Sequence, residues 1–153
     1  MTPRILLVTG SRVLEGSEFE DRAKRLLSMT LHSLPEKSIV VVGDASGPDA
    51  WATEYASGLG IALRIYALDG WVYDRHMARC RRWHLDEKTA PEPLPRNVAM
   101  VRGVAAQRPR AHVEALGLEA LWGTTHGTAY TLDKARKAGL PITHITFERS
   151  KGQ

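Results

Sequence analysis

Apolar and polar positions are arranged along this chain in two distinct ways. Short apolar runs bounded by glycine, proline or charge predict buried β-strands, whereas longer stretches with apolar residues at about every 3.6 positions predict amphipathic helices. The predicted strands are residues 4–9, 39–42, 61–66, 110–116 and 141–147, and the predicted helices are residues 17–34, 50–56, 95–109 and 129–138. Strands and helices therefore alternate along the chain.

This alternation predicts the fold class. Parallel neighbours in a sheet need a crossover connection, and a helix between consecutive strands supplies it. We therefore predict an α/β fold: a Rossmann-like three-layer α/β/α sandwich with a mainly parallel sheet of about five strands. The length of 153 residues suits one domain over residues 1–153, large enough to bury a substantial core.

Residues 73–95 depart from this pattern and form an irregular basic and proline-rich insertion. The first half predicts a short basic helix, and the second half predicts an extended loop. Three roles stay open: a lid over an anionic ligand, a solvated face or subunit contact, and a surface for single-stranded nucleic acid on which Trp83 stacks. The basic residues are Arg75, Arg79, Arg81 and Arg82, and the prolines are Pro91, Pro93 and Pro95.

Turns rich in polar residues and glycine follow several of the predicted strands. They are Gly10–Arg12, Gly43–Asp49, Asp69–Trp71 and Gly123–Thr128. The carboxyl ends of parallel strands meet at one edge of a sheet, and α/β sheets bind ligands there. We therefore expect these turns to converge on one ligand cleft.

Two of the turns have the chemistry of a phosphate site, because a helix start leaves backbone N–H groups unpaired and glycine lets an anion approach them. The turn Gly123–Thr128 adds hydroxyl and imidazole groups, so it is the preferred phosphate candidate. The turn Gly43–Asp49 is the opposite wall, since Asp44 and Asp49 repel phosphate unless they face a sugar or a water. Arg12 either bonds two phosphate oxygens with its planar guanidinium or is a solvated loop residue.

Two aspartates are candidate catalytic residues. Asp49 lies near a helix start, where it either caps the helix or contacts the ligand and orients a water. Asp69 can hydrogen-bond a sugar or base edge, and Trp71 beside it either stacks on a base or covers one end of the core. The predicted ligand-binding residues, which include the first turn of a helix at Arg96, are Gly10, Ser11, Arg12, Gly43, Asp44, Ser46, Gly47, Trp71, Arg96, Asn97, Gly123, Thr124, Thr125, Gly127 and Thr128.

Composition narrows the classes of partner. The chain is 43% hydrophobic and 25% charged, as soluble globular proteins are, and its formal net charge of +4 favours anionic ligands without by itself indicating DNA. No apolar run approaches the roughly 20 residues that span a membrane, and the N-terminal run predicts a strand, not a signal peptide. The single cysteine excludes an internal disulfide and favours a reducing, cytoplasmic location.

No metal site and no cofactor is predicted. His76, Cys80 and His84 would share one face of a helix. The two histidines, however, would lie about 12 Å apart by helical rise. That separation is too large for one zinc ion, whose ligands lie about 2 Å from the metal.

The order and spacing of the motifs resemble the YspA-like, cpYpsA-related branch of the SLOG superfamily. That superfamily has Rossmann-like folds and includes the lonely-guy phosphoribohydrolases and DNA-processing protein A. The resemblance runs from Arg4 to about Ile145. The residues that carry it are 9–12, 43–49 with Ala52, 69–71, Arg96 and Asn97 with Met100, 127–128 and 135–142.

The resemblance implies a nucleotide or nucleotide derivative as ligand, with its phosphate near Gly127–Thr128. It leaves catalysis open. The phosphoribohydrolases have an acidic residue shortly after their Gly-Thr turn, whereas Tyr130 and Thr131 stand here and Asp133 is the nearest carboxylate. Without a carboxylate to stabilise the ribose cation or activate water, cleavage of an N-glycosidic bond is the weaker hypothesis.

Three functions are therefore compared. The first is binding of a nucleotide derivative in the cleft at the strand ends, as a sensor or processing domain. The second is phosphoribohydrolase-like cleavage of a nucleoside monophosphate, with Asp49 or Asp69 replacing the missing carboxylate. The third is single-stranded nucleic-acid binding through residues 75–83. The expected partner is a nucleotide-type small molecule; a homodimer stays open, and no membrane partner is expected.

Overall fold

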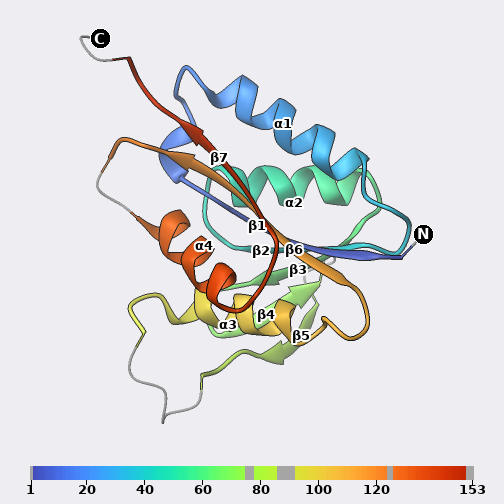
Figure 1. Ribbon diagram of the computed structural model, residues 1–153. Coiled ribbons are helices and arrows are strands. Elements are labelled where there is room, and N and C mark those ends of the chain that lie inside the picture. The colour runs from blue at the N-terminus through green and yellow to red at the C-terminus, as the bar shows by residue number, and fades with distance from the viewer. Residues whose placement is uncertain (1, 75–77, 86–91, 124–125, 151–153) are drawn as a thin grey trace.

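The computed structural model describes residues 2–74, 78–85, 92–123 and 126–150 (Figure 1). In chain order the elements are β1 (Arg4–Gly10), a short 3-10 helix η1 (Arg12–Leu14), α1 (Glu20–His32), β2 (Ile39–Gly43), α2 (Pro48–Gly58), β3 (Ala62–Tyr66), β4 (Trp71–Asp74), β5 (Arg79–Arg82), α3 (Pro95–Ala105), β6 (His112–Ala120), α4 (Gly127–Lys137) and β7 (Ile142–Phe147). Every helix and strand in the predicted alternation is present, with its ends shifted by a few residues.

The strands form one seven-stranded sheet in the order β5-β4-β3-β2-β1-β6-β7. β1, β2, β3, β6 and β7 pair in parallel. These are the five strands predicted from the apolar runs, so the α/β class and the mainly parallel sheet are confirmed. The sheet has more strands than predicted because β4 and β5 extend it antiparallel at one edge.

The hairpin of β4 and β5 falls where we predicted a short basic helix, and that prediction is wrong. Val72 is buried between two half-buried neighbours, which is the alternation of a strand. Across the hairpin, Arg82 lies opposite Trp71. The guanidinium carbons of Arg79 and Arg82 lie 4.8 and 5.1 Å from the centroid of the Trp71 ring. These cross-strand contacts stabilise the pairing of a strand that has no apolar periodicity of its own.

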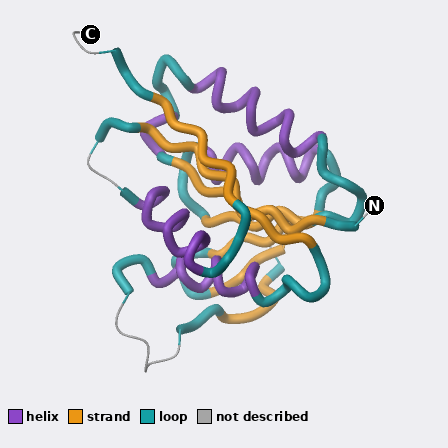
Figure 2. The backbone as a smooth tube through the Cα atoms, viewed as in Figure 1, coloured by secondary structure: helices purple, strands orange, loops and turns teal. Residues whose placement is uncertain are grey.

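Helices cover both faces of the sheet and make the three-layer Rossmann-like sandwich (Figure 1, Figure 2). On one face, α1 and α2 bury a core that includes Leu27 and Val42. On the other face, α3 and α4 bury a second core that includes Leu7 and Met100. Among the described residues, no helix has the length and apolar character that a bilayer crossing requires.

A sharp turn carries the chain from the end of β2 into α2. Gly47 precedes the helix with a φ of 79°, a conformation that glycine adopts without steric cost. Pro48 is the first helical residue, where its fixed φ and missing N–H suit the helix start. The turn brings the first residues of α2 back to the ends of the parallel strands, and Asp49 is buried there.

Candidate ligand-binding site

A cavity of about 640 Å³ opens at the edge of the sheet where the parallel strands end. Doubly wound α/β sheets bind ligands at this edge, because the loops that follow the strands meet there. The lining residues are Thr9, Gly10, Ser11, Arg12, Asp44, Ala45, Asp49, Leu68, Pro93, Leu94, Arg96, Asn97, Met100, His126, Gly127, Thr128 and Tyr130. The cavity thus draws on segments that are far apart in the sequence.

The structure brings many of the predicted ligand residues together in this cavity. They are Gly10, Ser11, Arg12, Asp44, Asp49, Arg96, Asn97, Gly127 and Thr128. Four predicted residues are not among the lining residues: Gly43, which ends β2, and Ser46, Gly47 and Gly123 in the surrounding turns. Thr124 and Thr125 lie outside the described residues.

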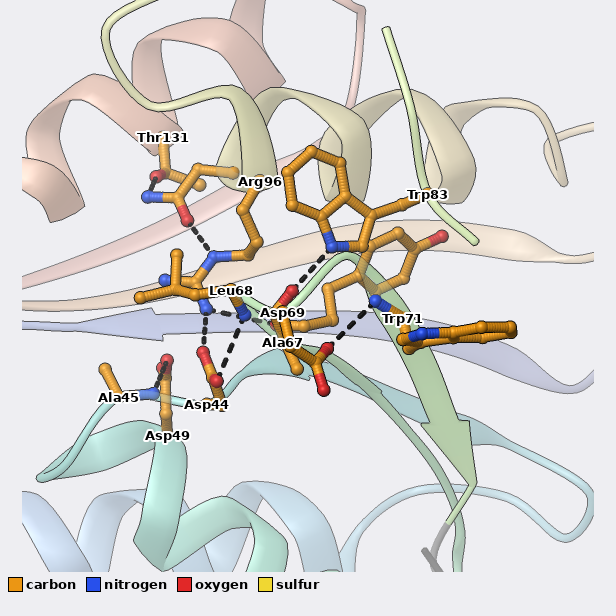
Figure 3. Close-up of polar contacts among 12 residues, drawn as sticks. Asp44, Ala45, Asp49, Ala67, Leu68, Asp69, Trp71, Trp83, Arg96 and Thr131 are labelled. Carbon is orange, nitrogen blue, oxygen red and sulfur yellow. Dashed lines mark hydrogen bonds and ion pairs between the residues drawn. The ribbon is translucent and has the colours of Figure 1, made fainter. Parts of the chain in front are cut away.

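Asp69 lies in the turn between β3 and β4, and Trp71 begins β4; neither is among the lining residues of the cavity. Asp69 accepts a 3.0 Å hydrogen bond from the Trp71 backbone N–H and a 2.5 Å hydrogen bond from the Tyr73 hydroxyl. The bond from Tyr73, followed by that from the backbone, lowers the pKa of Asp69. Figure 3 shows its carboxylate directed toward Trp71. Of the two candidate catalytic aspartates, only Asp49 lines the cavity.

Arg96 joins the ends of β2 and β3 to the start of α3 (Figure 3). Its Nη1 lies 2.5 Å from Asp44 Oδ1 and donates a 3.0 Å hydrogen bond to the Tyr66 carbonyl oxygen. Asp44 Oδ2 in turn accepts the Leu68 backbone N–H at 3.1 Å. The Arg96 side chain is only 12% exposed, so the ion pair is partly desolvated. Arg96 therefore builds the cavity wall, and Asp44 neutralises its charge.

A chain of hydrogen bonds continues from Arg96 to α4. Arg96 Nε donates to Asn97 Oδ1 at 2.6 Å, and Asn97 Nδ2 donates to Thr131 Oγ1 at 2.9 Å. The Thr131 hydroxyl donates to the Gly127 carbonyl oxygen at 2.8 Å. The Asn97 amide thus bonds Arg96 of its own helix through its oxygen and Thr131 of α4 through its nitrogen, and the second bond links the two helices beside the cavity.

The close packing of Arg96 and Asp49 requires glycine at position 43. A Cβ on Gly43 would lie 2.5 Å from Arg96 Nη1 and 2.8 Å from Asp49 Oδ2. Both distances are shorter than van der Waals contact, so a side chain here would displace the two groups. The bare backbone at the end of β2 lets a guanidinium and a carboxyl group pack over one strand terminus.

Asp49 is the buried acid of the cavity. Its side chain closes the turn before α2 by accepting a long 3.4 Å hydrogen bond from the Ala45 backbone N–H, and the residue is only 6% exposed. No ion pair of Asp49 is present among the described residues, since Arg96 is engaged by Asp44. Burial raises the pKa of Asp49 to about 7. The nearby charge of Arg96 and the hydrogen bond from Ala45 act in the opposite direction and are outweighed. Asp49 therefore exchanges a proton near neutral pH, as a general acid or base must.

Arg12 and the start of α4 form the electropositive side of the cavity. Arg12 is exposed and lines the cavity, and its guanidinium has no hydrogen bond or ion pair with any described residue. Thr128 is 5% exposed, and its hydroxyl has no hydrogen-bond partner within the described part of the chain. Tyr130 is the first residue of α4 whose N–H reaches a helical carbonyl, that of His126 at 2.9 Å. The N–H groups before it are the unpaired donors of a helix start.

The segment 92–94 forms a further wall and is tethered to α4. Glu92 accepts a 2.5 Å hydrogen bond from the Tyr130 hydroxyl and lies 3.0 Å from Lys134 Nζ. Desolvation, with the bond to Glu92 as the second cause, raises the pKa of Tyr130 to about 12. The last two residues of the segment line the cavity. The tether therefore holds the end of the proline-rich segment against the cavity.

Sequence patterns did not single out several lining residues as ligand contacts: Thr9, Ala45, Leu68, Pro93, Leu94, Met100 and Tyr130. Leu68 and Leu94 are 73% and 36% exposed. A large apolar side chain inside a polar loop is a signal that could have found both. Their exposed surface suits a flat apolar group such as a base.

A second cavity of about 620 Å³ lies at the opposite edge, where the parallel strands begin. It is lined by residues 34–39, 59–64, 74 and 80, and it contains none of the predicted ligand residues. In the described ranges, no group of three or more His, Cys, Asp or Glu side chains is arranged to hold a metal ion. Cys80 is exposed, and His76 lies outside the described residues. The carboxyl-edge cavity is therefore the candidate site.

No protein-family model and no curated protein matches the chain. Among solved structures, the chain is similar to the X-ray structure of TM1055, a structural genomics target. The two share 15% sequence identity, and the match covers 93% of this chain and 72% of that chain with a TM-score of 0.49. The candidate site is therefore interpreted from its own geometry.

Proposed function

We propose that this protein binds a nucleotide or nucleotide derivative in the carboxyl-edge cavity, as a sensor or processing domain. One observation carries the proposal: the cavity sets an unpaired cation, Arg12, beside an open helix start, and both face a wall that contains the buried acid Asp49. A phosphate is bound by a cation and by the N–H groups of a helix start, and a sugar hydroxyl can hydrogen-bond the carboxyl group on the opposite wall.

The proposed ligand lies with its phosphate at Arg12 and at the backbone N–H groups of Gly127 and Thr128. Its sugar hydroxyls face Asp49, which either donates or accepts a hydrogen bond near neutral pH because its pKa is about 7. Its base lies against the exposed apolar side chain of Leu68. The reverse orientation would place the phosphate against two carboxyl groups.

The sequence motifs support the same class of ligand. The residues that resemble the YspA-like branch of the SLOG superfamily include Gly10–Arg12, Asp44, Asp49, Asn97 and Gly127–Thr128, and these line the cavity. Membership in that branch is part of this proposal, as is the nucleotide that it implies.

Calorimetry with AMP and adenosine tests the phosphate side directly, because the two ligands differ by one phosphate. We expect the wild-type chain to prefer AMP by about tenfold or more, the worth of a charge-assisted hydrogen bond. Arg12→Ala should lose most of that preference. Arg25→Ala is the matched control, since it removes an equal charge from an exposed position on α1, away from the cavity.

Two results would overturn the proposal. One is a melting temperature that stays unchanged with millimolar AMP, ADP-ribose and NAD. The other is an Arg12→Ala variant that keeps the full preference for AMP over adenosine.

Cleavage of an N-glycosidic bond is a second candidate, favoured by the buried carboxyl of Asp49. A pKa of about 7 lets this group transfer a proton at neutral pH. Its position on the cavity wall makes it the replacement for the carboxylate that the turn after Gly127–Thr128 lacks. Asp69 accepts hydrogen bonds from Trp71 and Tyr73 and does not line the cavity, so Asp49 is the candidate acid for this reaction.

Product analysis tests the second candidate. Nucleoside monophosphates incubated with the protein should release free base at a rate that follows a group of pKa about 7. Asp49→Asn should abolish release while AMP still binds. Absence of free base at high protein concentration with every common base would eliminate cleavage and leave the binding proposal standing.

A further inference from the structure

The β4–β5 hairpin presents a basic surface built around one aromatic ring. β5 is the outermost strand of the sheet, and its residues are all exposed. The guanidinium groups of Arg79 and Arg82 both pack on Trp71, at 4.8 and 5.1 Å from the ring centroid. Together with Tyr73, these residues are called the basic hairpin face below.

The two arginines of this face keep their charge available. Neither Arg79 nor Arg82 forms an ion pair with a described residue. Asp69, the carboxylate nearby, accepts hydrogen bonds from the Trp71 backbone and from Tyr73, and the charges of Arg79 and Arg82 contribute to its lowered pKa without forming an ion pair with it. A guanidinium that stacks on an indole uses its flat face, so its in-plane N–H groups stay free for an anion.

Other basic and aromatic residues of the hairpin have structural roles instead. Arg81 donates a hydrogen bond to the Tyr66 hydroxyl. Trp83 Nε1 donates to the Ala67 carbonyl oxygen at 2.6 Å, as Figure 3 shows. The sequence suggested Trp83 as the stacking aromatic of a nucleic-acid surface. The structure places Trp71, not Trp83, beside the unpaired arginines.

Charge on an edge strand also prevents strand addition, but that role requires neither an indole nor stacked guanidinium groups. Single-stranded nucleic acid matches the whole face, because it offers a phosphate to each arginine and an unpaired base to a flat stack. A duplex hides its base faces, and an acidic peptide has no regular series of flat groups. We propose that the basic hairpin face binds single-stranded nucleic acid, with Arg79 and Arg82 at phosphates and a base on the stack that they form with Trp71.

Fluorescence anisotropy with labelled oligonucleotides of about 20 nucleotides tests this proposal. The full chain is titrated into single-stranded DNA, into single-stranded RNA of the same sequence and into the DNA duplex over a range of salt. Arg79→Ala combined with Arg82→Ala removes the proposed contacts. Arg25→Ala combined with Arg136→Ala is the control, because it removes the same charge from exposed positions on α1 and α4.

We expect single strands to bind, and the hairpin variant to lose about tenfold or more in affinity. Two lost phosphate contacts should also reduce the slope of log affinity against log salt by about 1.4, at about 0.7 for each contact. The control variant should lose much less. Binding of only DNA or only RNA supports the proposal and identifies the sugar that is recognised.

The ring is tested separately with Trp71→Ala and Trp71→Tyr. We expect the tyrosine variant to keep most of the affinity and the alanine variant to lose it. Circular dichroism melting shows whether each variant is folded. If Trp71→Ala does not fold, the proposal is judged on the affinity of the variant that combines Arg79→Ala with Arg82→Ala. No binding at low salt, equal losses in both arginine pairs, or equal competition by polyglutamate of matched charge would each overturn the proposal. Duplex binding as tight as single-strand binding would also do so.

Discussion

Replacing Asp49 with asparagine should stabilise the protein at high pH and leave its stability little changed at low pH. In the folded chain the Asp49 pKa is raised from 3.8 to about 7, chiefly by burial. Between these values the folded state binds a proton that the unfolded state has released. Stability therefore falls as pH rises from about 4 to about 7, and the full cost is present above that range.

The magnitude follows from the two pKa values. The interval from 3.8 to about 7, at about 1.4 kcal/mol for each pKa unit, corresponds to about 4 kcal/mol of lost unfolding free energy above pH 7. Asparagine has nearly the same shape and no charge to desolvate. We therefore expect Asp49→Asn to recover up to about 4 kcal/mol at pH 8, and to differ from wild type by less than about 1 kcal/mol at pH 4.

Urea unfolding followed by tryptophan fluorescence, at steps from about pH 4 to pH 8.5, measures this difference. Asp133→Asn is the control, because it neutralises a half-exposed aspartate paired with Lys137 at 3.0 Å on the surface of α4. Its effect should be small and nearly independent of pH. Curves for Asp49→Asn and wild type that run parallel across the whole range would refute the assignment of Asp49 as a buried, protonated acid.

Three further substitutions test the walls of the cavity. Gly43→Ala places a Cβ 2.5 Å from Arg96 Nη1, so urea unfolding should show a loss of about 1–3 kcal/mol; no loss would mean that this wall adapts freely. Asp44→Asn removes the charge that neutralises Arg96, so calorimetry should show AMP binding several-fold tighter, a gain of about 1 kcal/mol; unchanged or weaker binding would contradict a neutral wall. Glu92→Gln should lower the Tyr130 pKa from about 12 without restoring its usual value, because desolvation, the larger cause, remains; an unchanged ultraviolet titration would contradict the tether.

The parallel core of the fold could be predicted because its strands are buried along their length. Leu6, Leu7 and Val8 are almost fully buried, so β1 reads as an uninterrupted apolar run in the sequence. The edge strand β5 gives no such signal, since none of its residues is buried. What stabilises it is the cross-strand contact of Arg82 with Trp71, which depends on the hairpin already being formed.

The members of the candidate site could also be predicted in large part, because glycine-rich turns after parallel strands converge at one edge. The ion pairing and the protonation of these residues could not be predicted from the sequence. The sequence predicts Asp44 and Arg96 as ligand residues, and both line the cavity, but it does not predict that they neutralise one another at 2.5 Å across a separation of 52 positions. The raised pKa of Asp49 likewise depends on burial by segments that no local pattern connects. The sequence predicts many of the residues that line the cavity, and the fold determines which of them are paired with an opposite charge.

The two sides of the cavity therefore differ in charge. With Arg96 neutralised by Asp44, the unpaired cation that the described lining offers is Arg12, on the side where α4 begins. An anion bound there avoids the carboxyl group of Asp49, whose ionisation would otherwise be opposed further by a second negative charge. In the proposed binding mode, the stretch from Ile39 to Ala52 therefore faces the uncharged, hydroxyl-bearing part of the nucleotide. Its acid is held close to its own pKa at neutral pH, so its protonation can adjust to whichever hydrogen bond that part of the ligand requires.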